Sequence, residues 1–69
     1  MAEYLRDRQG RRLGEIVTDG DRRTIKDRYG HILGWYDARD GWTKNREGRW
    51  IGRGDMLVAL LMDALEREG

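Results

Sequence analysis

The 69-residue chain contains no cysteine, no serine, no proline and no phenylalanine, and its one histidine is His31. Cysteine and serine are the commonest side-chain nucleophiles, and cysteine and histidine are the commonest transition-metal ligands. The density of aspartates around Asp19 and Asp40 lacks the spacing of a calcium-binding loop and is typical of turns. The sequence therefore predicts a protein that is not an enzyme, with no catalytic residues, no cofactor and no metal site.

Long apolar runs are also missing, since the longest is Met56 to Met62, seven residues. A membrane span needs about 20 apolar residues, so no membrane partner is expected. The segment Met1 to Arg6 lacks the basic and apolar regions of a signal peptide. Together with the absence of cysteine, this favours a cytoplasmic location.

The charges nearly balance, with 14 Lys+Arg against 13 Asp+Glu, but their distribution is uneven. Residues 1–53 hold 13 basic and 9 acidic side chains, whereas residues 54–69 hold 1 basic and 4 acidic ones. One small domain covering residues 1–69 is the most that this length allows. Its core is marginal and has no disulfide to reinforce it, so a homo-oligomer is expected.

Three stretches of the chain repeat one pattern, namely residues 5–14, 25–34 and 43–52. The pattern is a basic-Asx-Arg run, a glycine two residues later, and a Leu/Ile-Gly pair. Asp7, Asp27 and Asn45 suit the first position of a type I turn. The first glycine of each copy (Gly10, Gly30 and Gly48) then falls where a hairpin loop needs positive φ. Residues 4–53 therefore predict three tandem β-hairpins that form a curved sheet or small open barrel.

This turn type also predicts the strand register. Leu5 should lie opposite Leu13, and Tyr4 opposite Gly14, with equivalent pairs in the other two hairpins. One face, taken as the core, should then carry the apolar residues of all three hairpins, continued at the strand ends by charged or aromatic ones. These residues are Leu5, Leu13, Ile25, Leu33 and Ile51, then Glu15, Trp35 and Arg53. The second glycine of each copy indicates sharp sheet curvature or a close backbone approach.

Residues 55–67 predict a C-terminal helix with Asp55 as its N-cap. The fold class is therefore mainly β with one C-terminal helix packed on the sheet. Leu57, Leu60, Leu61, Ala64 and Leu65 form one stripe, but the helix is apolar over much more of its surface. A second chain could cover the rest. The expected oligomer interface is Leu57, Leu60, Leu61, Met62 and Leu65.

The repeated motifs Asp7-Arg-Gln-Gly10, Asp27-Arg-Tyr-Gly30 and Asn45-Arg-Glu-Gly48, each followed by a Leu/Ile-Gly pair, resemble short β-hairpin repeat proteins of the YD-repeat and β-flower kinds. The resemblance covers residues 4–54. It implies a non-enzymatic fold that closes through oligomers, and it carries over no active site.

Arginines and aromatic side chains make the most distinctive candidate surface, because both types dominate interaction hot spots. The candidates are Arg8, Arg12, Arg28, Arg46, Arg49, Tyr29, Trp42 and Trp50. We expect a non-catalytic binding or assembly module that self-associates and binds a protein partner, in keeping with an accessory or inhibitor protein of a mobile genetic element. The alternative is nucleic-acid binding by the hairpin arginines and aromatics. A third reading is a solvated strand face with local ion pairs.

Overall fold

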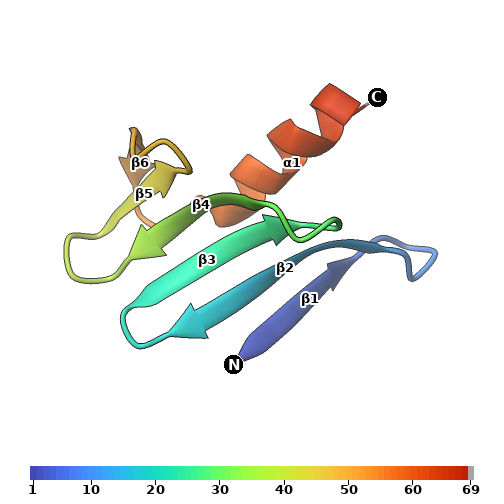
Figure 1. The fold of residues 1–69 in the computed structure, drawn as a ribbon, viewed down its shortest axis with the longest axis horizontal. Coiled ribbons are helices and arrows are strands. Elements are labelled where there is room, and N and C mark those ends of the chain that lie inside the picture. Colours follow the sequence, from blue (N-terminus) through green and yellow to red (C-terminus); the bar gives the residue numbers. More distant parts are fainter. Residues whose placement is uncertain (69) are drawn as a thin grey trace.

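A computed structural model describes residues 1–68, and Gly69 lies outside the described residues. The chain forms one open antiparallel sheet whose strands follow in sequence order, with one helix packed on it (Figure 1). The strands are β1 (Ala2–Arg6), β2 (Arg12–Asp19), β3 (Arg22–Asp27), β4 (Ile32–Asp37), β5 (Trp42–Asn45) and β6 (Trp50–Arg53), and the helix is α1 (Leu57–Glu68). The predicted fold class, mainly β with a C-terminal helix, is confirmed.

All three predicted hairpin turns close with the same hydrogen bonds. In the first, Asp7 Oδ1 accepts from the backbone N–H groups of Gln9 and Arg11, both at 2.9 Å. Asp27 and Asn45 accept equivalent bonds in the other two turns. The φ angles of the turn glycines are 82°, 85° and 86°, for Gly10, Gly30 and Gly48 respectively. Local chemistry thus sets each turn where the sequence places it.

Beyond the turns, the predicted register is wrong. Arg6 lies opposite Arg12 as expected, but Leu5 lies opposite Gly14 because Leu13 is an extra residue in β2. The same β-bulge recurs in β4 and β6, so that Ile25 faces Gly34 and Thr43 faces Gly52. Each bulge shifts the pairing by one residue.

The bulges also reverse part of the predicted core face. Side chains alternate between the two faces of a strand, and Ile16 is buried beneath the helix. Its neighbour Glu15 therefore lies on the opposite face, and the register places Trp35 and Arg53 there too. The expectation that these three continue the core is wrong. Ile51, at the third bulge, is 41% exposed.

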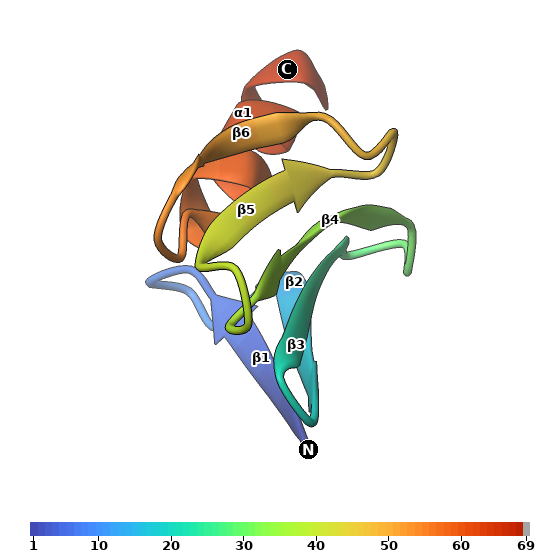
Figure 2. The ribbon, with the colours of Figure 1, turned by 90° about the vertical axis from the view of Figure 1, so that its left-hand side faces the viewer.

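The second glycine of each hairpin forms the seat of α1. A Cβ on Gly34 would lie 2.6 Å from Cδ1 of Leu60, and one on Gly14 would lie 2.9 Å from Cδ1 of Leu61. Gly14 lies beneath Leu61 and Gly34 beneath Leu60 of α1, while Gly52 lies beneath Met56, the residue just before the helix. The close backbone approach suggested by the sequence is thus an approach to the helix. Seen from the side, the sheet curls so that β5 and β6 rise toward α1 (Figure 2).

The core is small and lies between α1 and the middle of the sheet. Its buried apolar residues are Ile16, Ile25, Leu57 and Leu61. Leu60 and Leu65 are half-buried against this cluster, whereas Met62 is 52% exposed. The chain's own sheet therefore covers Leu57 and Leu61, two of the five residues expected at an oligomer interface. Self-association itself stays a prediction.

Polar contacts fix the start of α1. The buried hydroxyl of Thr43, in β5, accepts a hydrogen bond from the Met56 N–H at 2.9 Å and donates one to the Gly54 carbonyl at 2.6 Å. Asp55 Oδ1 accepts from the Leu57 N–H at 3.1 Å, as expected of a cap, and its other carboxylate oxygen pairs with Arg23 of β3. Two of the N–H groups at the helix start, those of Met56 and Leu57, thus have side-chain acceptors.

Among residues 1–68, α1 is the only helix, and it is too short to cross a bilayer.

Candidate functional site

The sheet face opposite α1 gathers the tryptophans and several cations. Trp35, Trp42 and Trp50 lie on the adjacent strands β4, β5 and β6, and the centroids of the Trp42 and Trp50 rings are 4.8 Å apart. Lys44 lies directly between Trp35 and Trp50 in the register. We call this group the cation–aromatic face. It consists of Trp35, Trp42, Trp50, Arg22, Lys44 and Arg53.

A cation lies over each of the three tryptophan rings. The distances from cation to ring centroid are 5.2 Å for Arg22 and Trp35, 4.8 Å for Lys44 and Trp50, and 5.5 Å for Arg53 and Trp42. Such pairs contribute roughly 0.5–1 kcal/mol each at exposed sites. They hold the rings in place, and Trp50 remains 56% exposed. The face thus combines exposed ring surface with a cation over each ring.

The same face carries carboxylates beside its cations. Glu15 lies opposite Lys26, and Arg22 lies between Asp19 and Asp37 in the register. Near the tryptophans, Lys44 Nζ donates to Asp40 at 2.6 Å. That bond, with the Trp42 N–H donated to the same carboxylate, lowers the pKa of Asp40 below its usual value. The face is consequently mixed in charge.

The sequence-predicted surface divides between two places. Arg12, Trp42 and Trp50 lie on the face opposite α1, where Arg12 sits 4.0 Å from the centroid of Tyr4 at the β1 end. The others lie at or just beyond the hairpin turns, at the sheet ends, and are Arg8, Arg28, Tyr29, Arg46 and Arg49. Arg28 stacks 5.4 Å from the centroid of Tyr29, which is exposed. The turns and the face therefore form separate surfaces.

The surface predicted from the sequence lacked four members of the face, namely Trp35, Arg22, Lys44 and Arg53. The predicted register placed Trp35 and Arg53 on the core side, and the β-bulges reverse them. Within two residues along the chain, Trp35 has one charged neighbour, Asp37, and Trp42 has two, Asp40 and Lys44, so the sequence around them gave only a weak signal of exposure. Without the bulge positions, that signal could not be assigned to a face.

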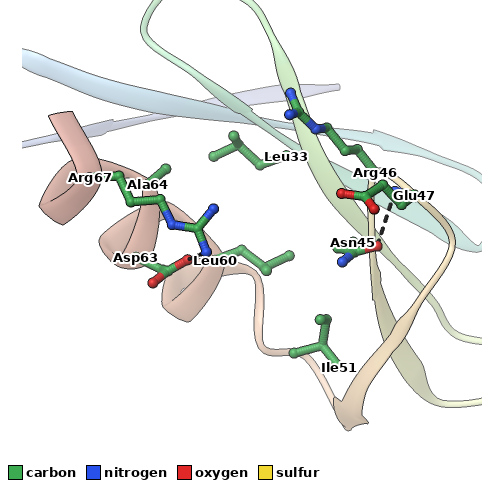
Figure 3. Close-up of a pocket in the computed structure, with 9 residues that line it drawn as sticks. All are labelled: Leu33, Asn45, Arg46, Glu47, Ile51, Leu60, Asp63, Ala64 and Arg67. Carbon is green, nitrogen blue, oxygen red and sulfur yellow. Dashed lines mark hydrogen bonds and ion pairs between the residues drawn. The ribbon is translucent and has the colours of Figure 1, made fainter.

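A groove lies on the helix side, between α1 and the turn joining β5 to β6 (Figure 3). This groove encloses about 270 Å³. Its apolar lining is Leu33, Ile51, Leu60 and Ala64, and its polar lining is Asn45, Arg46, Glu47, Asp63 and Arg67. Arg67 pairs with Asp63 at 3.0 Å, and Asn45 is engaged in its own turn. The charged side chains at its rim thus carry both signs.

His31 lies just after the second turn, exposed, with Nδ1 3.4 Å from the Asp27 carboxylate. Asp27 already accepts two backbone hydrogen bonds at the turn. Within the part of the chain that the structure describes, no three His, Cys, Asp or Glu residues are grouped to hold a metal ion.

Comparison with protein-family models, curated proteins and solved structures found no match for this chain.

Proposed function

We propose that the protein is a non-catalytic, cytoplasmic binding module that holds a protein partner on its cation–aromatic face. The single observation that carries the proposal is the row of tryptophans on β4, β5 and β6, each with a cation over its ring. Tryptophan and arginine are the residues most enriched in interaction hot spots. A ring that already contacts a cation loses less conformational entropy on binding than a ring without contacts would.

The charges of the face favour a polypeptide over a nucleic acid. Each carboxylate on the β2–β4 part of the face lies opposite a cation, and Lys44 is paired with Asp40. A phosphate backbone would therefore approach carboxylates as well as cations, whereas a polypeptide can present both signs and apolar side chains. We infer that the partner contacts Trp50 and Trp42 with apolar groups and meets the mixed charges at the rim.

Selection of peptides from a random display library tests the proposal, because it needs no knowledge of the natural partner. Selected peptides are titrated against the wild type, Trp50→Ala, and the matched control Tyr29→Ala, an exposed aromatic at a turn. We expect Trp50→Ala to weaken binding by at least tenfold, as is typical of a hot-spot residue. Tyr29→Ala should leave the affinity within about twofold.

Titration with single-stranded DNA at several salt concentrations covers the alternative. A polyanion bound through several phosphate contacts loses affinity steeply as salt rises, while an apolar protein contact changes little. If the wild type binds DNA tightly with a steep salt dependence, and Trp50→Ala does not bind, the partner is a nucleic acid and not a protein. If the selected peptides bind Trp50→Ala and the wild type with equal affinity, the cation–aromatic face is not the binding site.

A further inference from the structure

β1 presents a free edge that is longer and more regular than the other edge of the sheet. It is one of the two edges of the sheet, is five residues long and contains no bulge of its own. The other edge strand, β6, has only four residues and is interrupted by the bulge at Ile51. Short strands and bulges are devices that prevent edge pairing. β6 is therefore blunted, and β1 is available.

The hydrogen bonds to β2 show which backbone groups of β1 point outward. Met1 and Thr18 exchange both of their bonds, with N···O distances of 2.7 and 3.1 Å. Hydrogen-bonded pairs alternate along an antiparallel strand, so Glu3 and Leu5 also direct their N–H and C=O groups toward β2. The same groups of Ala2, Tyr4 and Arg6 are directed away from the sheet.

We propose that this edge pairs with β1 of a second copy, antiparallel, about a twofold axis at Tyr4. Tyr4 then lies opposite Tyr4 of the second copy, and Ala2 lies opposite Arg6. The outward groups of Ala2, Tyr4 and Arg6 become the hydrogen-bonding partners. Two six-stranded sheets join into one continuous sheet.

The side chains of β1 favour pairing with β1 of a second copy in this register. With Tyr4 opposite Tyr4, the carboxylate of Glu3 lies opposite Leu5, and no like charges face each other. Sliding the strands by two residues places Glu3 opposite Glu3 in one direction and opposite Asp7 in the other. Like charges directly opposite destabilise a strand pair, whereas an aromatic pair stabilises it. β1 is thus complementary to itself in one register.

The twofold symmetry limits the assembly to two chains and determines how their two cation–aromatic faces are placed. A twofold contact uses the same patch on both copies and closes on itself, and the blunted β6 edges end the sheet on both sides. An axis perpendicular to the sheet keeps both cation–aromatic faces on the same side. A partner with two binding segments would then gain affinity by avidity. The pairing itself does not depend on the identity of that partner.

Light scattering on a sizing column over a dilution series tests the pairing. We expect a mass twice the 8.1 kDa of one chain at high concentration. Proline is tolerated at edge positions whose N–H points outward, so Tyr4→Pro should keep the fold and weaken the dimer by at least tenfold. Tyr4→Ala keeps the N–H and should weaken it less. Met62→Asp, on the exposed side of α1, should have no effect.

Three results would overturn the proposal. They are a wild-type monomer at every concentration, a dimer unaffected by Tyr4→Pro, and a dimer lost in Met62→Asp, which would place the contact on the helix. If Tyr4→Pro fails to fold by circular dichroism, hydrogen exchange of the wild type decides. The amides of Tyr4 and Arg6 should be protected at high concentration and exchange rapidly on dilution, while that of Leu5 stays protected. Peptide binding by the folded monomeric variant tests the cation–aromatic face separately.

Discussion

Replacing Gly34 by alanine should displace α1 from its seat. The added Cβ would lie 2.6 Å from Cδ1 of Leu60 and would also clash with the backbone carbonyl oxygen of Lys44. The leucine can change rotamer, but the carbonyl belongs to the neighbouring strand, so β4 and β5 must separate. Overpacking typically costs about 1–3 kcal/mol, and we expect Gly34→Ala to lie near 3 kcal/mol because backbone must move.

Alanine substitutions at the three equivalent glycines should lower the free energy of unfolding by different amounts, and comparing them tests this reasoning. Gly14→Ala meets a backbone carbonyl at 2.6 Å as well as Leu61, so its cost should approach that of Gly34→Ala. Gly52→Ala meets only the flexible side chain of Met56 and should cost about 1 kcal/mol, at the low end of the same range.

Urea unfolding followed by tryptophan fluorescence measures the series. A chain of this size has a stability of roughly 3–10 kcal/mol and an m-value of about 1 kcal/mol/M, so Gly34→Ala should lower the midpoint by about 3 M. The double variant Gly34→Ala with Leu60→Ala should be less destabilised than the sum of its single variants, because the two sites are in contact. Equal costs at Gly34 and Gly52 would refute the clash with the β5 backbone, and strict additivity of Gly34→Ala and Leu60→Ala would refute the seating of the helix on β4.

Three further predictions concern the polar contacts and the core. Thr43→Val should cost about 2 kcal/mol, because it leaves the Met56 N–H and the Gly54 carbonyl without the buried hydroxyl, whereas Thr43→Ser should retain most of the stability in the same urea assay. Ile25→Ala should cost about 3 kcal/mol in that assay through loss of a fully buried side chain; a cost below about 1 kcal/mol would contradict its central place. The turn hydrogen bonds and Arg11 lower the pKa of Asp7. The stability that the Asp7 carboxylate contributes is therefore present above its unfolded pKa near 3.9 and is lost as pH falls through the lower folded value. Asp7→Asn, which copies Asn45 of the third turn, should weaken this pH dependence without unfolding the turn at pH 7.

The sequence predicts the hairpin turns and the helix well because their determinants are local. Asp7 bonds to N–H groups two and four residues ahead, and Gly10 adopts the positive φ that its turn requires. The bulges at Leu13 and its equivalents are not local. They bring Gly14 beneath Leu61, more than 40 residues later in the chain. That register places Gly14 in contact with the helix, a long-range contact that turn chemistry alone does not specify.

The same long-range requirement explains why the candidate surface was predicted only in part. A shift of one residue moves every following side chain to the other face, so the register that places Gly34 beneath α1 also turns Trp35 outward. Glycines on one face and tryptophans on the other are thus two consequences of one set of bulges. A helix seated on the first face leaves the second without a covering element of its own. The cation–aromatic face is therefore coupled to the helix seat, and a substitution that shifts the register should affect helix packing and partner binding together.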